Sequence, residues 1–147
     1  MLVLDDVRSL WNVGSMFRSA DCLGTAHLYL CGITGIPPHR DIHRTALGAE
    51  DSVPWSYHPH PFEALDALRA AGARIVALER TADAVALRSV AWEGPIGLVV
   101  GNEEGGVAPE VLAACDVSCD IEMRGTKNSL NVAVACGIAL YQIDALV

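Results

Sequence analysis

The sequence lacks the cysteine pattern of a disulfide-stapled or zinc-binding protein. Its five cysteines are an odd number, and none of them belongs to a C-x-x-C pair. Cys115 and Cys119 have C-x-x-x-C spacing, but no second pair of ligands completes a four-ligand zinc site. We therefore expect no metal and no disulfide, and we expect the thiols to be buried and inert.

The sequence also has little positive charge. Its 147 residues carry 10 Lys and Arg against 18 Asp and Glu, which gives a formal net charge of −8. Proteins that hold nucleic acid mainly by neutralising its phosphates are usually basic. Any nucleic-acid role therefore has to rest on a local basic patch or on the help of a partner.

We also expect neither an export signal nor a membrane anchor. The apolar first residues run directly into Asp5 and Asp6, without the basic region that opens a signal peptide. The apolar segment at residues 129–147 is interrupted by polar side chains, and no basic residue follows it to anchor a membrane helix. We expect a cytoplasmic protein with no membrane partner.

What the sequence does contain is enough apolar material for one core. Hydrophobic residues make up 52% of the chain and charged residues only 19%. This balance excludes intrinsic disorder, and the length suits one domain rather than two. We expect residues 1–147 to form a single domain.

Short apolar runs alternate with amphipathic stretches, as in α/β proteins. The expected strands are residues 2–4, 27–31, 53–57 (an edge strand, because of its proline), 74–78, 96–100 and 116–123. The expected helices are the stretch that follows the Asn12-Val-Gly14 turn, residues 62–71, residues 109–115 and the C-terminal segment. Residues 33–53 are predicted to be an irregular connection. The pattern predicts a mostly parallel sheet with helices on both faces.

The C-terminal helix is apolar nearly all round, whereas a surface helix needs only one apolar stripe. A homodimer partner would cover its second side, and the alternative is a central core helix of a monomer. The residues that make it apolar are Leu130, Val132, Ala133, Val134, Ile138, Ala139, Leu140 and Ile143.

A glycine-rich loop follows the apolar run at residues 96–100, but it is not a phosphate loop. Neither G-x-G-x-x-G nor G-x-x-x-x-G-K-[ST] occurs in the sequence. Residues 101–106 read G-N-E-E-G-G, and two carboxylates there would repel a polyphosphate. The loop favours a neutral or cationic ligand, although a plain strand-to-helix turn would also explain its glycines.

Two further segments, residues 12–20 and 121–133, also combine a strand end, a polar loop and a helix start. Ligands of α/β sheets bind beyond the carboxyl ends of the strands, so the three loops are expected to share one site. Without a ligand, Asn12 would be a helix cap, Arg18 part of a surface salt bridge and Glu103 a solvated acid. The candidate residues of the shared site are Asn12, Arg18, Glu103, Ser129 and Asn131.

Together, the three motifs resemble the signature of the SpoU/TrmH family of SPOUT RNA methyltransferases. Residues 12–20 match N-x-G-x-x-x-R-[ST]-A, residues 101–106 match G-N-E-x-x-G, and residues 121–132 match I-P-M-x-G-x-x-x-S-L-N-V. Glu122 stands where the third pattern usually has proline, so φ is not locked there. Residues 45–49 also resemble the family's substrate-side loop. The resemblance covers essentially the whole chain and is that of the catalytic domain only.

The resemblance implies an α/β fold with a C-terminal trefoil knot, a homodimer with its site near the subunit interface, and S-adenosylmethionine bound in the knot. The reaction it implies is methyl transfer to a ribose 2′-hydroxyl of RNA. This sulfonium cofactor carries no phosphate, which fits the acidic glycine loop. By the same resemblance the cofactor lies against Leu78, Gly101, Asn102, Ile121, Met123, Ser129 and Leu130.

The resemblance also assigns catalytic roles. Arg18 would lie near the 2′-hydroxyl, where it would hold the ribose-phosphate and stabilise developing alkoxide charge. It is a poor general base, because a guanidinium pKa exceeds about 12. Asn12, Glu103, Ser129 and Asn131 would orient Arg18 and the substrate through hydrogen bonds.

The RNA itself is less well defined, with tRNA favoured over rRNA. The residues expected to contact it are Arg8, Arg40, Arg44, Arg124 and Lys127, and their alternative role is as solvated surface cations. Because the net charge is negative, a second protein is a candidate helper in binding the RNA. The negative charge also leaves a rival function, a non-catalytic regulatory or assembly module that binds S-adenosylmethionine or RNA. An enzyme acting on nucleotide phosphates is disfavoured, because the phosphate loops are missing.

Overall fold

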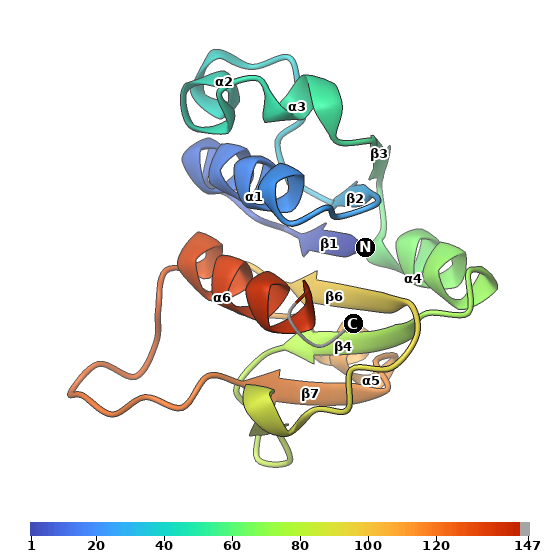
Figure 1. The fold of residues 1–147 in the computed structure, drawn as a ribbon, viewed down its shortest axis with the longest axis vertical. Helices are drawn as coiled ribbons and strands as arrows, with labels where there is room; N and C mark the ends of the chain where they lie inside the picture. The colour runs from blue at the N-terminus through green and yellow to red at the C-terminus, as the bar shows by residue number, and fades with distance from the viewer. Residues whose placement is uncertain (145–147) are drawn as a thin grey trace.

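The strands of the chain form one seven-stranded sheet in which every paired strand is parallel to its neighbour (Figure 1). A computed structural model describes residues 1–144, so residues 145–147 of the predicted domain lie outside the described part. The strand order is β3-β2-β1-β6-β4-β7-β5. The strands are β1 (Leu2–Asp5), β2 (Leu28–Cys31), β3 (Trp55–His58), β4 (Arg74–Leu78), β5 (Val85–Ala86), β6 (Ile96–Val100) and β7 (Val117–Asp120).

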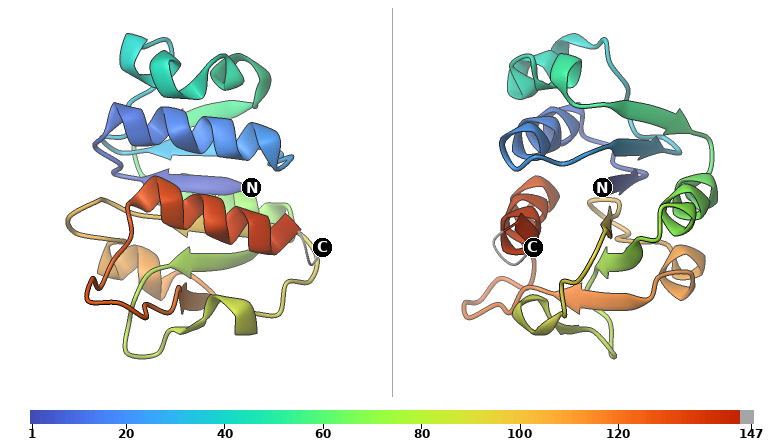
Figure 2. Two further views of the ribbon diagram at one scale, coloured as in Figure 1. Left: turned by 60° about the vertical axis from the view of Figure 1, so that its left-hand side comes forward. Right: turned by 45° about the vertical axis from the view of Figure 1, so that its right-hand side comes forward.

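Helices cover both faces of this sheet, as predicted. α1 and α6 lie side by side on one face, where α2 and α3 pack against α1, and α4 and α5 lie on the other face (Figure 2). The helices are α1 (Leu10–Cys22), α2 (Arg40–Ala46), α3 (Ala49–Ser52), α4 (Pro61–Ala70), α5 (Pro109–Ala113) and α6 (Val132–Asp144), with one short 3-10 turn, η1 (Leu87–Ser89).

Burial on both faces explains why the central strands are apolar runs. All residues of β1 and β6 are buried, and successive residues of a strand point to opposite faces. Leu2 and Leu4 accordingly join the core under α1 and α6, whereas Val3 joins the core under α4. The prediction that the strand containing Trp55 lies at the sheet edge is confirmed by the position of β3.

The start of the first helix differs from the prediction. α1 begins at Leu10, and its N-cap is Ser9, whose hydroxyl oxygen accepts a hydrogen bond from the Asn12 N–H at 3.3 Å. The predicted turn at residues 12–14 is therefore helical, and Asn12 is not a cap. Serine is a strong N-cap, so the helix starts one turn earlier than the glycine suggested.

Other parts of the prediction also differ from the structure. The segment 33–53 is not wholly irregular, because it contains α2 and α3. Both helices are short and pack against α1, so their stability comes from tertiary contact rather than from a visible periodicity. The strand predicted at 116–123 is β7 and ends at Asp120, and the two-residue strand β5 escaped detection.

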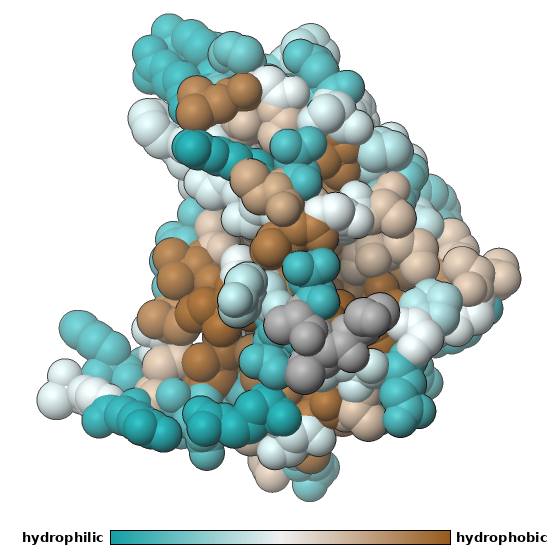
Figure 3. All heavy atoms as spheres, in the orientation of Figure 1, coloured by the Kyte–Doolittle hydropathy of each residue, from teal (hydrophilic) through white to brown (hydrophobic). Residues whose placement is uncertain are grey.

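α6 buries only one side within the chain. Ala133, Cys136, Ala139 and Leu140 are buried, while its opposite side keeps apolar side chains in solvent. Figure 3 shows apolar side chains gathered over α6, beside the hydrophilic arm formed by the segment between β7 and α6. This exposed side, which we call the α6 face, consists of Val134 (51% exposed), Ile138 (42%) and Tyr141 (65%). Within residues 1–144, the chain therefore leaves the second apolar side of α6 uncovered.

The thiols follow the prediction only in part. Cys31, Cys119 and Cys136 are buried, and burial raises the pKa of each to about 12, which makes them inert. Cys115 is half-buried and Cys22 is exposed, because Cys22 ends α1 on its outer side.

No helix within residues 1–144 has both the length and the apolar character needed to span a membrane. The trefoil knot and the single-domain organisation stay predictions.

Candidate functional site

A cleft of about 450 Å³ opens at the carboxyl ends of three neighbouring strands. β6, β4 and β7 are adjacent in the sheet, so the loops that follow them meet at one edge. The loops after β4 and β6 form two walls of the cleft. The irregular segment 121–131, which leads from β7 to α6, forms the third. The lining residues include all seven that the sequence predicts for the cofactor: Leu78, Gly101, Asn102, Ile121, Met123, Ser129 and Leu130.

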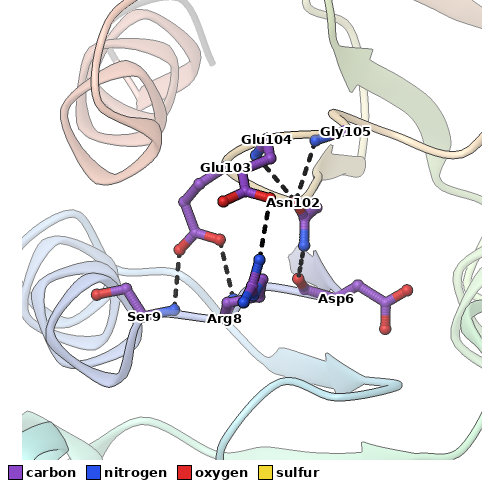
Figure 4. A network of polar contacts seen from close by, with 7 residues as sticks. All are labelled: Asp6, Arg8, Ser9, Asn102, Glu103, Glu104 and Gly105. Carbon is purple, nitrogen blue, oxygen red and sulfur yellow. Dashed lines mark hydrogen bonds and ion pairs between the residues drawn. The ribbon is translucent and has the colours of Figure 1, made fainter.

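Glu103 ties the loop after β6 to the start of α1. Its carboxylate accepts hydrogen bonds from the backbone N–H groups of Arg8 (2.9 Å) and Ser9 (3.0 Å), as Figure 4 shows. The side-chain amide of Asn12 donates a third, at 2.9 Å. Burial alone would raise the pKa of Glu103, but these hydrogen bonds hold the pKa below the ordinary glutamate value. The side chain is therefore a carboxylate at neutral pH, placed where the helix dipole favours negative charge.

Asn102 shapes the same loop from inside. Its side-chain oxygen accepts hydrogen bonds from the backbone N–H groups of Glu104 (2.8 Å) and Gly105 (3.0 Å), and its side-chain nitrogen donates to the Asp6 carbonyl at 2.8 Å (Figure 4). Its backbone also pairs with that of Gly106. The loop is thus a closed turn fastened to the end of β1, which fixes the direction of the neighbouring glutamate side chains.

The third motif joins the first through a pair of asparagines. The Asn131 side-chain nitrogen donates to the Asn12 side-chain oxygen at 3.1 Å. The Asn131 side-chain oxygen accepts from the Ala133 N–H at 2.9 Å and so satisfies a free donor at the start of α6. The contacts Glu103–Asn12–Asn131 therefore connect three segments that are far apart in the sequence. Ser129 lies beside them in the cleft lining.

Sequence reasoning missed Glu79, which lies in the cleft wall at the end of β4. Its carboxylate accepts a hydrogen bond from the Val107 N–H at 2.9 Å. A Cβ atom at Gly106, where φ is +68°, would overlap this carboxylate, so glycine is needed there for both conformation and space. The available signal was an acid placed directly after a buried strand.

The next residue, Arg80, crosses the cleft. Its guanidinium donates a hydrogen bond to the Asn128 carbonyl at 3.3 Å and so links the loop after β4 to the segment 121–131. Among the residues that line the cleft it is the one base, set against the acids Glu79, Glu103, Glu104 and Asp120.

Glu122, which replaces the usual proline, lies on the same irregular segment. Its carboxylate forms an ion pair with Arg88 at 2.8 Å. Both side chains are largely exposed, so the pair adds little stability. The ion pair links the segment 121–131 to η1, which contains Arg88.

Arg18 is not brought to the cleft. It lies six residues after Asn12 on α1, about 9 Å along the axis and on another side of the helix. Its side chain is exposed and lines a separate hollow between α1, α2 and α6, together with Arg44 and Tyr141. Within one chain, then, four of the five predicted catalytic residues lie together and the fifth lies apart.

The arginines predicted to hold RNA around α1 and α2 are partly neutralised. Arg8 forms an ion pair with Glu104 at 3.0 Å. Arg40 and Arg44 both approach Asp41, at 3.6 Å and 3.8 Å. These pairs are exposed, so each is weak enough to exchange for a phosphate.

Arg124 and Lys127 lie elsewhere, on the segment 121–131. Both side chains are exposed. The five predicted RNA contacts thus lie on separate elements, before α1, on α2 and on the segment 121–131.

The lining of the cleft suits a particular kind of ligand. Leu78, Ile121 and Met123 offer an apolar wall for a flat ring, and the three loops offer backbone donors and acceptors. The surplus of acids favours a cation and disfavours a polyphosphate. No group of three or more metal-ligating side chains occurs within residues 1–144. S-adenosylmethionine, with its adenine ring and sulfonium charge, fits this donor set.

Comparison with known proteins identifies relatives along nearly the entire chain. The sequence pattern of the SpoU rRNA Methylase family matches residues 1–141. The chain is 34% identical to the 23S rRNA (guanosine-2′-O-)-methyltransferase RlmB of Nitrosomonas europaea, over 97% of this chain and 54% of that protein. It is 33% identical to the tRNA (guanosine(18)-2′-O)-methyltransferase of Aquifex aeolicus, over 94% of this chain and 65% of that protein.

A solved structure agrees with these relationships. The AdoMet-bound rRNA methyltransferase from Sinorhizobium meliloti superimposes with a TM-score of 0.91 at 30% identity, over 98% of this chain and 55% of that one. The present chain therefore spans a little more than half the length of several relatives. The match in sequence and in fold covers all three motifs around the cleft, and the chain belongs to the SpoU rRNA methylase family.

Proposed function

We propose that the chain is the methyl-transfer domain of an S-adenosylmethionine-dependent RNA 2′-O-methyltransferase. The observation that carries the proposal is that the second and third motifs line one cleft, and that Asn12 of the first motif contacts Glu103 and Asn131 of that lining. The names of the relatives support the same reaction on either rRNA or tRNA. RNA and S-adenosylmethionine are both cytoplasmic molecules, so the proposal includes a cytoplasmic location.

In this proposal the cleft holds the cofactor and the asparagines position the substrate. When bound, S-adenosylmethionine supplies an electrophilic methyl group. The apolar wall around Leu78 and Met123 would hold its adenine, while the acidic side chains favour its positive charge. Asn12, fixed by the Glu103 carboxylate, and Asn131, which donates to Asn12, would orient the ribose for in-line attack. Arg18 would hold the adjacent phosphate and stabilise charge on the attacking oxygen, whose proton would pass to water.

The position of Arg18 makes a homodimer part of the proposal. Arg18 lies outside the cleft of its own chain, on the side of α1 that faces the hollow next to Tyr141. A second copy that covered the α6 face would bury Val134, Ile138 and Tyr141 and would bring one chain's Arg18 toward the other chain's cleft. The trefoil knot, which would form the cofactor site, belongs to the same proposal.

For the RNA we propose tRNA rather than rRNA, held by Arg8, Arg40, Arg44, Arg124 and Lys127. The net charge of −8 and the ion pairs of the first three arginines favour weak binding by the chain alone. A protein helper would then strengthen the complex. The same observations are the basis of the second candidate, a module that binds the cofactor or RNA without catalysis.

Methyl transfer tests the proposal directly. Purified protein is incubated with radiolabelled S-adenosylmethionine and, separately, total tRNA and rRNA from a strain that lacks the protein. We expect label in tRNA at a ribose 2′-oxygen. Label in rRNA alone would contradict the choice of RNA, and cofactor binding without label in either pool would favour the non-catalytic module.

Arg18→Ala tests the assigned mechanism. The variant is expected to bind S-adenosylmethionine as the parent does but to methylate RNA at least a hundredfold more slowly, roughly 3 kcal/mol of barrier. Arg69→Ala, an exposed arginine of α4 on the opposite face, is the matched control. Equal rates for Arg18→Ala and the parent would refute the role of Arg18.

A further inference from the structure

A tryptophan stands exposed on α1 next to the proposed site. Trp11 is 51% exposed, whereas Trp92 is 6% exposed and Trp55 is half-buried. An exposed aromatic side chain of this size contributes little to the core and is costly to leave in water. Core packing therefore uses only part of the Trp11 side chain, and about half of it is open to a ligand.

Two residues of α2 contact Trp11, one at its backbone and one at its ring. The Thr45 hydroxyl donates a hydrogen bond to the Trp11 carbonyl at 2.9 Å. The guanidinium carbon of Arg44 lies 5.9 Å from the centroid of the Trp11 ring, within cation–π range. The Trp11 backbone is thus tied to α2, and a cation lies beside the Trp11 ring.

The charges around Trp11 suit a polyanion. In a chain of net charge −8, residues 39–44 hold two arginines and two histidines against a single aspartate. The side chains of Arg40 and Arg44 of α2 are 78% and 51% exposed, and Arg44 lies against the Trp11 ring. Arg8, before the helix begins, is 57% exposed. Nucleic acids that lack a partner strand bind to such surfaces, where bases stack on aromatic rings and cations meet the phosphates.

Trp11 is also close to the groups that would position the ribose. It directly precedes Asn12, whose side chain contacts both Glu103 and Asn131. Seven residues separate it from Arg18, which places both on the same side of α1 and about 10 Å apart along its axis. A base on Trp11 and a phosphate near Arg18 would therefore belong to the same short stretch of RNA.

We infer that Trp11 is a platform on which an unpaired base of the RNA stacks, next to the ribose that is methylated. The inference rests on the proposed function and names its substrate class: the target lies in a single-stranded loop. A base inside a duplex does not offer its face to a side chain.

Binding of a labelled RNA hairpin tests the platform, with a fully paired duplex of the same composition as the comparison. Trp11→Ala is expected to weaken binding of the hairpin about tenfold and to leave binding of the duplex and of S-adenosylmethionine unchanged. Trp11→Phe, which keeps an aromatic face, is expected to bind the hairpin within about threefold of the parent. Phe62→Ala removes an aromatic side chain of similar exposure (42%) from α4 on the other face and serves as the control.

Tryptophan fluorescence supplies a second readout. Stacking of a base is expected to quench the emission of the parent when the hairpin is added, but not when the duplex is added. Trp11→Phe is expected to bind the hairpin without this quenching. Quenching that persists in Trp11→Phe would assign the signal to Trp55 or Trp92 and overturn the inference.

The outcomes separate the platform from the proposed function. A parent that neither binds nor methylates RNA would contradict the proposed function. A parent that does both, with an unchanged hairpin affinity in Trp11→Ala, would contradict only the platform. A lower sedimentation mass of Trp11→Ala would instead assign Trp11 to an interface between two copies of the chain, which also overturns the inference.

Discussion

Glu103 shows how one side chain can hold a site together. Its carboxylate accepts three hydrogen bonds from residues at the start of α1, two of them from backbone N–H groups that no helical partner satisfies. Glu103→Ala is expected to remove these bonds, to lower the free energy of unfolding by about 1 kcal/mol and to reduce methylation strongly. Chemical denaturation and the methyl-transfer assay measure the two effects.

The ionisation of Glu103 adds a pH dependence with a definite sign. Because hydrogen bonds lower the pKa of this carboxyl in the folded state, its contribution to stability is complete above the ordinary glutamate pKa of about 4.3. It is lost as the pH falls below that value and through the lowered pKa. Glu103→Gln should therefore be less stable than the parent at neutral pH, and the difference should shrink in acid. An unchanged difference across this range would contradict the assignment.

The contribution of Asp5 to stability has the opposite pH dependence. This residue is only 4% exposed at the end of β1, and burial, with the charges of Asp6 and Glu110, raises its pKa to about 6. The stability that its protonated form provides is complete below the unfolded pKa near 4 and is lost as the pH rises through about 6. At neutral pH the buried carboxylate therefore costs free energy.

Asp5→Asn tests this cost. The variant is expected to be more stable than the parent at about pH 7, by on the order of 1–3 kcal/mol, because the amide carries no charge. The gain should vanish at about pH 4, where Asp5 of the parent is protonated. Thermal unfolding at the two pH values measures both, and a variant that is less stable at neutral pH would refute the argument.

Between elements, the closest packing joins α1 to α2. A Cβ atom at Gly14 of α1 would overlap the Thr45 side chain and the Ile42 carbonyl of α2. In an isolated helix, alanine would be favoured over glycine by about 1 kcal/mol. Here the clash outweighs that preference, because the backbone atoms of α2 have no room to move away.

Gly14→Ala is therefore expected to lower the melting temperature by several degrees, consistent with a loss of about 1–3 kcal/mol. Gly125→Ala is the control, since a Cβ atom there meets nothing within 4 Å. Circular dichroism during heating compares the two. A Gly14→Ala variant as stable as the parent would show that the two helices can separate without cost.

For the whole molecule, the apolar α6 face leads to a prediction of the assembly. Sedimentation is expected to give a mass near twice 15.6 kDa at micromolar concentration. Ile138→Asp places a charge in the centre of this face and should yield monomers that keep the fold but lose methylation. Val85→Asp, an exposed apolar position on β5, is the matched control and should remain dimeric. A monomeric parent would refute the dimer.

Much of this molecule was predictable from local patterns. The apolar runs of β4 and β6, the edge position of β3 and the helices on both faces follow from periodicity and turn residues. The cleft was predictable as well, because loops after adjacent parallel strands must meet at one sheet edge. The start of α1 was mistaken for a turn, since a glycine chosen for close packing on α2 looks the same in sequence as a glycine chosen for a turn.

By itself, then, the sequence determined the parallel α/β fold, the three motifs and the cleft lined by the second and third of them. Tertiary structure alone decided which side chains touch. Glu79 was revealed by its contact with the backbone of Val107, and Arg18 lies outside the cleft because the helix turns it to another side. Tertiary packing also decided that α2 and α3 form, since both short helices depend on contact with α1. The periodicity of apolar residues in the sequence indicates which side of a helix or strand is buried. Contacts between residues far apart in the sequence form only when the chain folds.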